Sequence, residues 1–103
     1  MKPWGPYNDV LKTVLKDPKM AVGYINTALE EGDWNAFLLA LRHVAEVHGG
    51  LTHLAKKAKL HRVHLYRMLS RSGNPGMRNV LDILHALGYR LTISHPTKLD
   101  KAA

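Results

Sequence analysis

Apolar side chains recur every three or four residues over most of this chain, which is the period of an α-helix that buries one face. The pattern predicts a short amphipathic segment at 8–16 and longer helices at 18–31, 34–48 and 77–87. The helix at 34–48 has the widest apolar stripe. We therefore expect that helix to be the scaffold of the core.

Residues that favour the ends of helices lie between these segments. Pro18 suits the first turn of the helix at 18–31, with Asp17 as its cap, and Gly32 ends that helix. Asp33 is the expected cap of the next helix, and Gly49–Gly50 stop it because glycine accepts a positive φ.

The loop 72–76 precedes the helix at 77–87, and Asn74 with Pro75 after it predicts a cap near that point. Gly88 closes this last helix.

The stretch 51–70, LTHLAKKAKLHRVHLYRMLS, predicts two short helices joined by a tight turn. In a helix-turn-helix unit the helices cross closely, so the first needs a small residue at the crossing and the turn needs a buried apolar residue. Ala55 meets the first requirement and Leu60 the second. Lys59 occupies a turn position where Gly is common, at a cost of roughly 1 kcal/mol for a left-handed backbone. A plain helical hairpin in a small bundle is the alternative interpretation.

The second of these helices has a cationic face opposite its apolar positions. That face carries Arg62, Val63, His64, Tyr66, Arg67 and Arg71. Seven basic residues and no acidic residue lie between Leu51 and Arg78, whereas residues 1–50 hold five basic and six acidic residues. A positive field centred on a helix-turn-helix is typical of a phosphate-binding face, although a run of charge alone is often only a solvated surface. We expect this face to enter the major groove of DNA.

Residues 89–94, YRLTIS, alternate apolar and polar side chains, which predicts a β-strand. Tyr89, Leu91 and Ile93 form its apolar face. No other segment alternates convincingly, and the backbone of a strand needs a partner. We therefore expect this strand to pair with its copy in a second subunit or with another protein. An extended tail laid on the helices is the alternative.

Composition excludes several classes of function. The 103 residues suit one domain, and the 46% apolar content favours a folded globule. No Cys is present, which excludes disulfides and thiolate metal sites and fits a cytoplasmic location. We expect no membrane span and no secretory signal. His53, His61 and His64 lie close in sequence, but without cysteines or nearby carboxylates we expect no metal, no cofactor and no enzymatic activity.

Together, HVAEVHGGLTHLAKKAKLHRVHLYRMLSRSGNP and MRNVLDILHALGYRLTIS resemble a known group. They look like the probable addiction-module antidote proteins, which are HigA-like antitoxins with a Cro/C1-type helix-turn-helix. The resemblance implies a mainly α fold: a five-helix domain at 34–94 that ends in a short strand, preceded by a helical extension at 1–33 and followed by a flexible tail at 95–103. It implies a homodimeric repressor that binds the operator of its own operon and a RelE/ParE-like toxin.

The resemblance also implies roles for single residues. Arg62, Val63 and Arg67 would reach base edges, and arginine suits guanine because its fork meets O6 and N7 together. Tyr66 and His64 would flank them, and His61 stands where Ser or Thr commonly caps the recognition helix. The expected phosphate contacts are Thr52, Lys56, Arg71, Asn74, Arg78 and Asn79.

Two other functions remain open at this point. One is a protein-interaction module with little DNA role, and the other is a solitary prophage-type regulator without a toxin. Loss of DNA binding without loss of toxin binding in Arg62 and Arg67 variants would separate the two surfaces. A small toxin-like reading frame beside the gene would separate the antitoxin from the solitary regulator.

Overall fold

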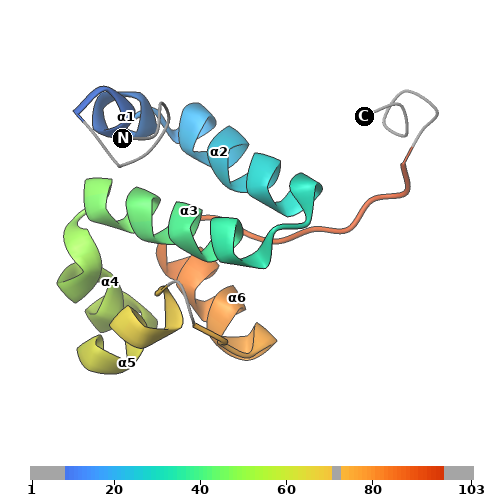
Figure 1. Ribbon diagram of the computed structural model, residues 1–103. Coiled ribbons are helices and arrows are strands. Elements are labelled where there is room, and N and C mark those ends of the chain that lie inside the picture. The colour runs from blue at the N-terminus through green and yellow to red at the C-terminus, as the bar shows by residue number, and fades with distance from the viewer. Residues whose placement is uncertain (1–8, 71–72, 97–103) are drawn as a thin grey trace.

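The computed structural model describes residues 9–70 and 73–96, and these ranges contain six helices and no strand. The helices are α1 (Asp9–Leu15), α2 (Pro18–Glu31), α3 (Trp34–Val47), α4 (Gly50–Ala58), α5 (Arg62–Met68) and α6 (Met77–Ala86). In Figure 1, α1 and α2 lie on one side of α3, and α4, α5 and α6 lie on the other. None of these helices is long and apolar enough to cross a membrane.

The ends of α2 and α3 follow from single residues. The Asp17 side chain accepts a hydrogen bond from the Lys19 amide at 2.9 Å, and Asp33 accepts one from the Ala36 amide at 3.1 Å. Gly32, with φ 71°, ends α2 in a left-handed conformation. These bonds satisfy amides that the first turn of each helix leaves unpaired, so both predicted caps are confirmed.

Helix α3 is the scaffold of a single hydrophobic core, as its apolar stripe predicted. Phe37, Leu38, Leu41 and Val44 on this helix are at most 2% exposed. The other five helices all contribute side chains to the same cluster, among them Leu15, Ile25, Leu54, Leu65 and Ile83. The core therefore fixes the helix-turn-helix pair to α3 and α6.

The helix count and the C-terminal strand differ from the sequence-based expectation. The region 34–94 contains four helices in its described part, not five, and α1 and α2 precede it. Residues 89–96 run out as an extended segment in Figure 1, but they form no strand within 9–70 and 73–96. A ladder needs a second extended segment, and every other long described segment is helical. Pairing with a second subunit therefore remains a prediction.

The start of α6 also differs in detail. The residue at the cap position is Gly76, which has no side chain with which to cap the helix, and not Asn74. Glycine residues elsewhere behave as predicted, because Gly49, Gly50 and Gly88 all have positive φ at helix ends. The N-terminal arm at 1–7 and most of the expected tail, at 97–103, lie outside the described residues.

Candidate nucleic-acid interface

A sharp turn joins α4 to α5 and closes the C-terminal end of α4. Lys59 has φ 58° and ψ 42°, and among the described residues it is the one non-glycine with positive φ. The Leu60 amide donates to the Ala55 carbonyl at 2.9 Å, and the Lys59 amide donates to the Lys56 carbonyl at 3.3 Å. These bonds pair carbonyls that a helix end otherwise leaves free. The left-handed turn predicted at Lys59 is confirmed.

Small and apolar side chains hold α5 against the body of the protein. Ala55 is 4% exposed, and Leu60 is half-buried against the core. Leu65 and Met68 anchor α5 from the other side of the turn, at 0% and 4% exposure. The small residue and the turn residue thus lie where the helix-turn-helix pattern predicted them.

The opposite face of α5 points to solvent. Arg62, Val63, His64, Tyr66 and Arg67 are all exposed. Even the apolar Val63 and the aromatic Tyr66 are 50% and 40% exposed, although burial against the core would stabilise both. Arg71, which the sequence placed on this face, lies outside the described residues.

Arg62 is oriented by neighbours on α4 and α5. Its Nη1 lies 3.5 Å from the Thr52 hydroxyl and its guanidinium carbon 6.0 Å from the centre of the Tyr66 ring. Both neighbours direct the side chain while leaving its charge exposed. Thr52, expected to contact phosphate, therefore lies beside a predicted base-reading residue.

Arg42 joins this group from α3, and sequence reasoning missed it. Its guanidinium carbon lies 5.4 Å from the centre of the Tyr66 ring. The electron-rich face of an aromatic ring attracts a cation at this distance. The Nε atom of Arg42 also lies 3.9 Å from Oε2 of Glu46. Arg42 precedes the acid-free run in the sequence, so nothing in the sequence pattern indicated that it belongs to this surface. Only the packing of α3 beside the turn brings it to this surface.

A second group of predicted residues surrounds a shallow hollow of about 460 Å³ between the end of α5 and the start of α6. His64, Arg67, Asn74 and Asn79 line it. Gly73 also lies here, where a Cβ atom would be 2.2 Å from the Met68 carbonyl oxygen, so only glycine fits without a shift of the backbone. The close approach brings the start of α6 next to Arg67.

Two further predicted phosphate contacts are exposed cations. Lys56 lies on the outer surface of α4. The Arg78 side chain is 91% exposed and lies 4.0 Å from Asp82, a separation at which an exposed ion pair is weak. Both cations are therefore available to an anionic partner.

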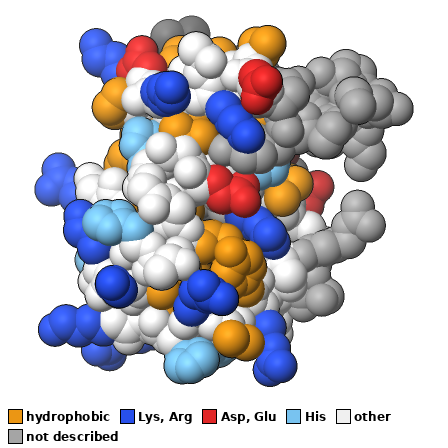
Figure 2. Space-filling model, turned by 90° about the vertical axis from the view of Figure 1, so that its left-hand side faces the viewer, with side chains coloured by type: hydrophobic (Ala, Val, Ile, Leu, Met, Phe, Trp, Pro, Cys, Tyr) orange, Lys and Arg blue, Asp and Glu red, His pale blue; other side chains and the backbone are white. Residues whose placement is uncertain are grey.

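Figure 2 shows how charge is distributed over one face of the protein. Lys and Arg side chains occur over the whole of this face, whereas the visible acidic side chains lie at mid-height and above, so the lower part, where α4 and α5 lie, shows basic side chains without acidic ones. The described part of the acid-free run from Leu51 to Arg78 therefore gives this surface a positive field.

A partly buried polar pair lies away from this surface and joins α2 to α3. The Tyr24 hydroxyl and His43 Nδ1 are 2.8 Å apart, and His43 is 7% exposed. Burial, with a smaller contribution from the charge of Arg42, lowers the pKa of His43 from 6.5 to about 4. Burial also raises the pKa of Tyr24. The pair is neutral at pH 7 and has a structural role.

The histidines near the turn do not gather into a metal site. Within the described ranges, no group of three or more His, Asp or Glu side chains is placed to hold a metal ion. His61 caps α5 through its backbone conformation and makes no side-chain hydrogen bond there.

Comparison with known protein families identifies the class of protein. The family model described as "Probable addiction module antidote protein" matches residues 8–95, which include all six helices and the extended segment after α6. The chain belongs to this family. No curated protein and no solved structure matches it significantly.

Membership of the antidote family supports an antitoxin role and implies a toxin partner. The match also covers the helix-turn-helix and its exposed cationic face.

Proposed function

We propose that this antidote is a sequence-specific DNA-binding protein that represses its own operon. The exposed cationic face of α5 carries the proposal, because a short helix held at its apolar side and bearing Arg62 and Arg67 on its outer side suits the major groove. Arg62 and Arg67 would contact base edges, and Val63 would contact a thymine methyl group.

Phosphate contacts would fix the position of α5 on the duplex. Lys56 on α4 and Arg78 on α6 are exposed cations, and Asn74 and Asn79 line the hollow beside the recognition helix. Such contacts supply affinity and register without reading sequence. Arg42 extends this set from α3.

The DNA-binding form would be a homodimer. A single short helix reads few base pairs, and helix-turn-helix proteins reach adequate specificity by placing two recognition helices one DNA turn apart. Tyr89, Leu91 and Ile93 would form the contact, as the apolar face of a strand paired between two copies.

The antitoxin function would use a RelE/ParE-like toxin of the cytoplasm as the second partner, bound directly and without catalysis. Family membership supports this proposal over a solitary regulator. The neighbouring gene offers a simple test, because a toxin of this kind would be encoded beside the antidote.

Fluorescence anisotropy with labelled DNA from upstream of the gene tests the DNA-binding function. We expect tight binding to this DNA and weak binding to a scrambled duplex of equal length. Arg62→Ala combined with Arg67→Ala should abolish the preference, whereas Lys16→Ala, which removes an exposed charge beyond α1, should preserve it. Equal affinity for both duplexes in the unaltered protein would reject the proposal.

A further inference from the structure

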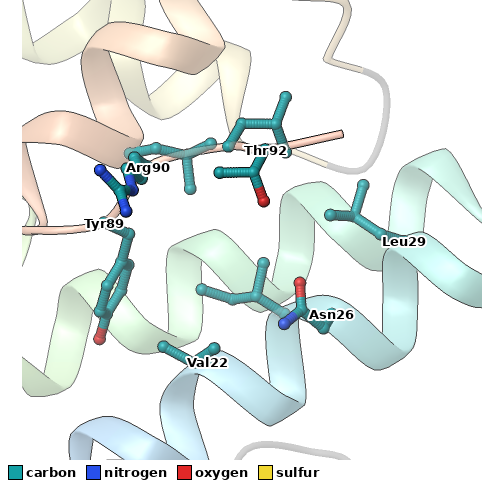
Figure 3. A pocket seen from close by; sticks show the side chains of 9 residues that line it. Val22, Asn26, Leu29, Tyr89, Arg90 and Thr92 are labelled. Atoms are coloured by element: carbon teal, nitrogen blue, oxygen red, sulfur yellow. The ribbon is translucent and has the colours of Figure 1, made fainter. Parts of the chain in front are cut away.

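An open groove runs between α2 and the extended segment that follows α6. It has a volume of about 410 Å³ and is lined from α2 by Val22, Ile25, Asn26 and Leu29 and from the segment by Tyr89, Arg90, Leu91 and Thr92, with Leu84 also lining it. In Figure 3, the labelled α2 side chains point toward the segment across the groove. Val22 and Leu29 are 39% and 37% exposed, so the groove leaves apolar surface open to water.

Two features of the segment leave it open to a partner: its backbone hydrogen bonding and the exposure of Ile93. Within the described residues, the last backbone hydrogen bond runs from the Tyr89 amide to the Leu84 carbonyl, at 2.9 Å, and none joins residues 90–96 to another backbone group. Ile93 is 98% exposed, the largest exposure among the large hydrophobic side chains described. Extended backbone without a backbone partner and an exposed branched side chain both favour pairing with another chain.

We infer that the groove of each subunit receives Ile93 from a second copy of this chain, an inference that rests on the proposed homodimer. Two segments would pair antiparallel with Leu91 on the two-fold axis. The partner subunit's Ile93 would then lie opposite Tyr89 and beside the α2 wall. The contact is reciprocal, so each copy supplies one groove and one isoleucine.

The alternation of side chains favours this register. The apolar residues of the segment occupy the odd-numbered positions 89, 91 and 93. Only a register that pairs odd-numbered positions with odd-numbered positions keeps the apolar side chains of both strands on the same face of the two-stranded sheet. With Leu91 on the axis, Arg90 lies opposite Thr92 and every apolar residue lies opposite another. Placing position 90 on the axis would instead set two arginines directly opposite each other, which is destabilising.

A second copy fits this groove better than an unrelated protein. The same short segment carries both the free edge and the apolar side chain that lie next to the groove, so the surface is complementary to itself. The segment also shares no residue with the cationic face of α5. A dimer formed here leaves both recognition helices accessible.

Sedimentation equilibrium of the full chain tests the inference. Ile93→Asp and Val22→Asp should each raise the dimer dissociation constant more than about tenfold, because a charge replaces apolar contact at both copies. Val10→Asp is the matched control, since Val10 is 73% exposed on α1 outside the groove. Circular dichroism checks that each variant remains helical. An unaltered protein that stays monomeric, or two groove variants that dimerise normally, would overturn the inference.

Disulfide cross-linking tests the register. The chain contains no cysteine, so each introduced cysteine can pair only with another introduced one. Leu91→Cys should form a disulfide-linked dimer on mild oxidation, and Thr92→Cys should form much less. A mixture of Asn26→Cys and Ile93→Cys chains should give a mixed dimer across the groove. Efficient linking through position 92 with none through position 91 would reject the register.

The same variants separate this inference from the proposed function. Groove variants that remain dimeric and still bind upstream DNA would refute the groove contact and leave DNA binding intact. A cross-linked dimer that does not distinguish upstream from scrambled DNA would refute DNA recognition and leave the groove contact intact.

Discussion

Lys59 shows how one residue sets the angle between α4 and α5. Its left-handed backbone disfavours a side chain, and glycine would relieve that cost while adding freedom to the unfolded chain. We expect Lys59→Gly to raise the free energy of unfolding by about 0.5–1 kcal/mol, measured by urea denaturation.

Lys57→Gly is the matched control, because it removes the same charge from the helical part of α4. It should lower the free energy of unfolding by up to about 1 kcal/mol. Opposite signs for the two variants would support the strain at Lys59, and destabilisation by both would contradict it.

The Thr52 hydroxyl lies within hydrogen-bond distance of the Arg62 guanidinium, so the effects of the two residues on DNA binding should be coupled. If Thr52 acts by orienting Arg62, then Thr52→Val should weaken binding to the preferred DNA but have little further effect once Arg62 is alanine. Arg62→Ala alone should cost about 1–3 kcal/mol on that DNA and relax one base preference. Anisotropy titrations of the two single variants and the double variant measure the coupling. Purely additive losses, equal on all sequences, would indicate that Thr52 contacts phosphate instead.

At the scale of elements, the Tyr24–His43 pair links the stability of the α2–α3 packing to pH. The folded pKa of His43 is about 4 and its ordinary value is 6.5, so between these values the unfolded chain takes up a proton that the folded chain does not. The free energy of unfolding should therefore fall as the pH decreases from 6.5 to 4, by roughly 1–3 kcal/mol from this group.

Urea denaturation of the unaltered protein and of His43→Gln at pH 7 and pH 4.5 measures this contribution. The variant should be less stable at pH 7, because it loses the contact with Tyr24, but it should lose less stability on acidification. An equal loss in both proteins would assign the acid sensitivity to other groups.

Elements whose signals are local were predictable from the sequence. Asp17 with Pro18, Asp33 and the glycines after α2 and α3 determine helix ends through bonds within a few residues, so the boundaries followed from the pattern. The turn at Lys59 was predictable for the same reason.

Features that depend on distant residues were not predictable in this way. The extended segment at 89–96 has no backbone partner among the described residues, so its alternation could not establish a strand within one chain. Arg42 reaches Tyr66 only through packing between helices that are separated in sequence. Alternating side chains and runs of charge are properties of neighbouring residues in the sequence. The pairing of the 89–96 segment and the contact between Arg42 and Tyr66 depend instead on which segments meet in space.

Over the whole molecule, the cationic face of α5 and the groove beside α2 share no residue. Figure 1 shows α4 and α5 below α3, while the segment after α6 runs away from them. A protein that carries charge on one surface and a pairing edge on another can bind DNA as a dimer without competition between the two contacts.

The net charge of +7 predicts strong dependence of DNA affinity on salt. The dissociation constant should rise steeply between about 50 and 200 mM salt, because bound phosphates release counterions. Lys56→Ala should weaken binding to preferred and scrambled DNA about equally and reduce the salt slope by about 1. An affinity that does not change over this range of salt would be inconsistent with a phosphate-binding surface.

Major-groove recognition by α5 can be tested by replacing each guanine of the upstream DNA, one at a time, by 7-deazaguanine, which lacks the N7 acceptor in the major groove. If α5 reads that groove through Arg62 and Arg67, affinity should fall at a few guanines grouped in two half-sites about 10 base pairs apart, and the loss at one of them should disappear in Arg62→Ala. Affinity that is unchanged at every guanine would contradict recognition by these arginines.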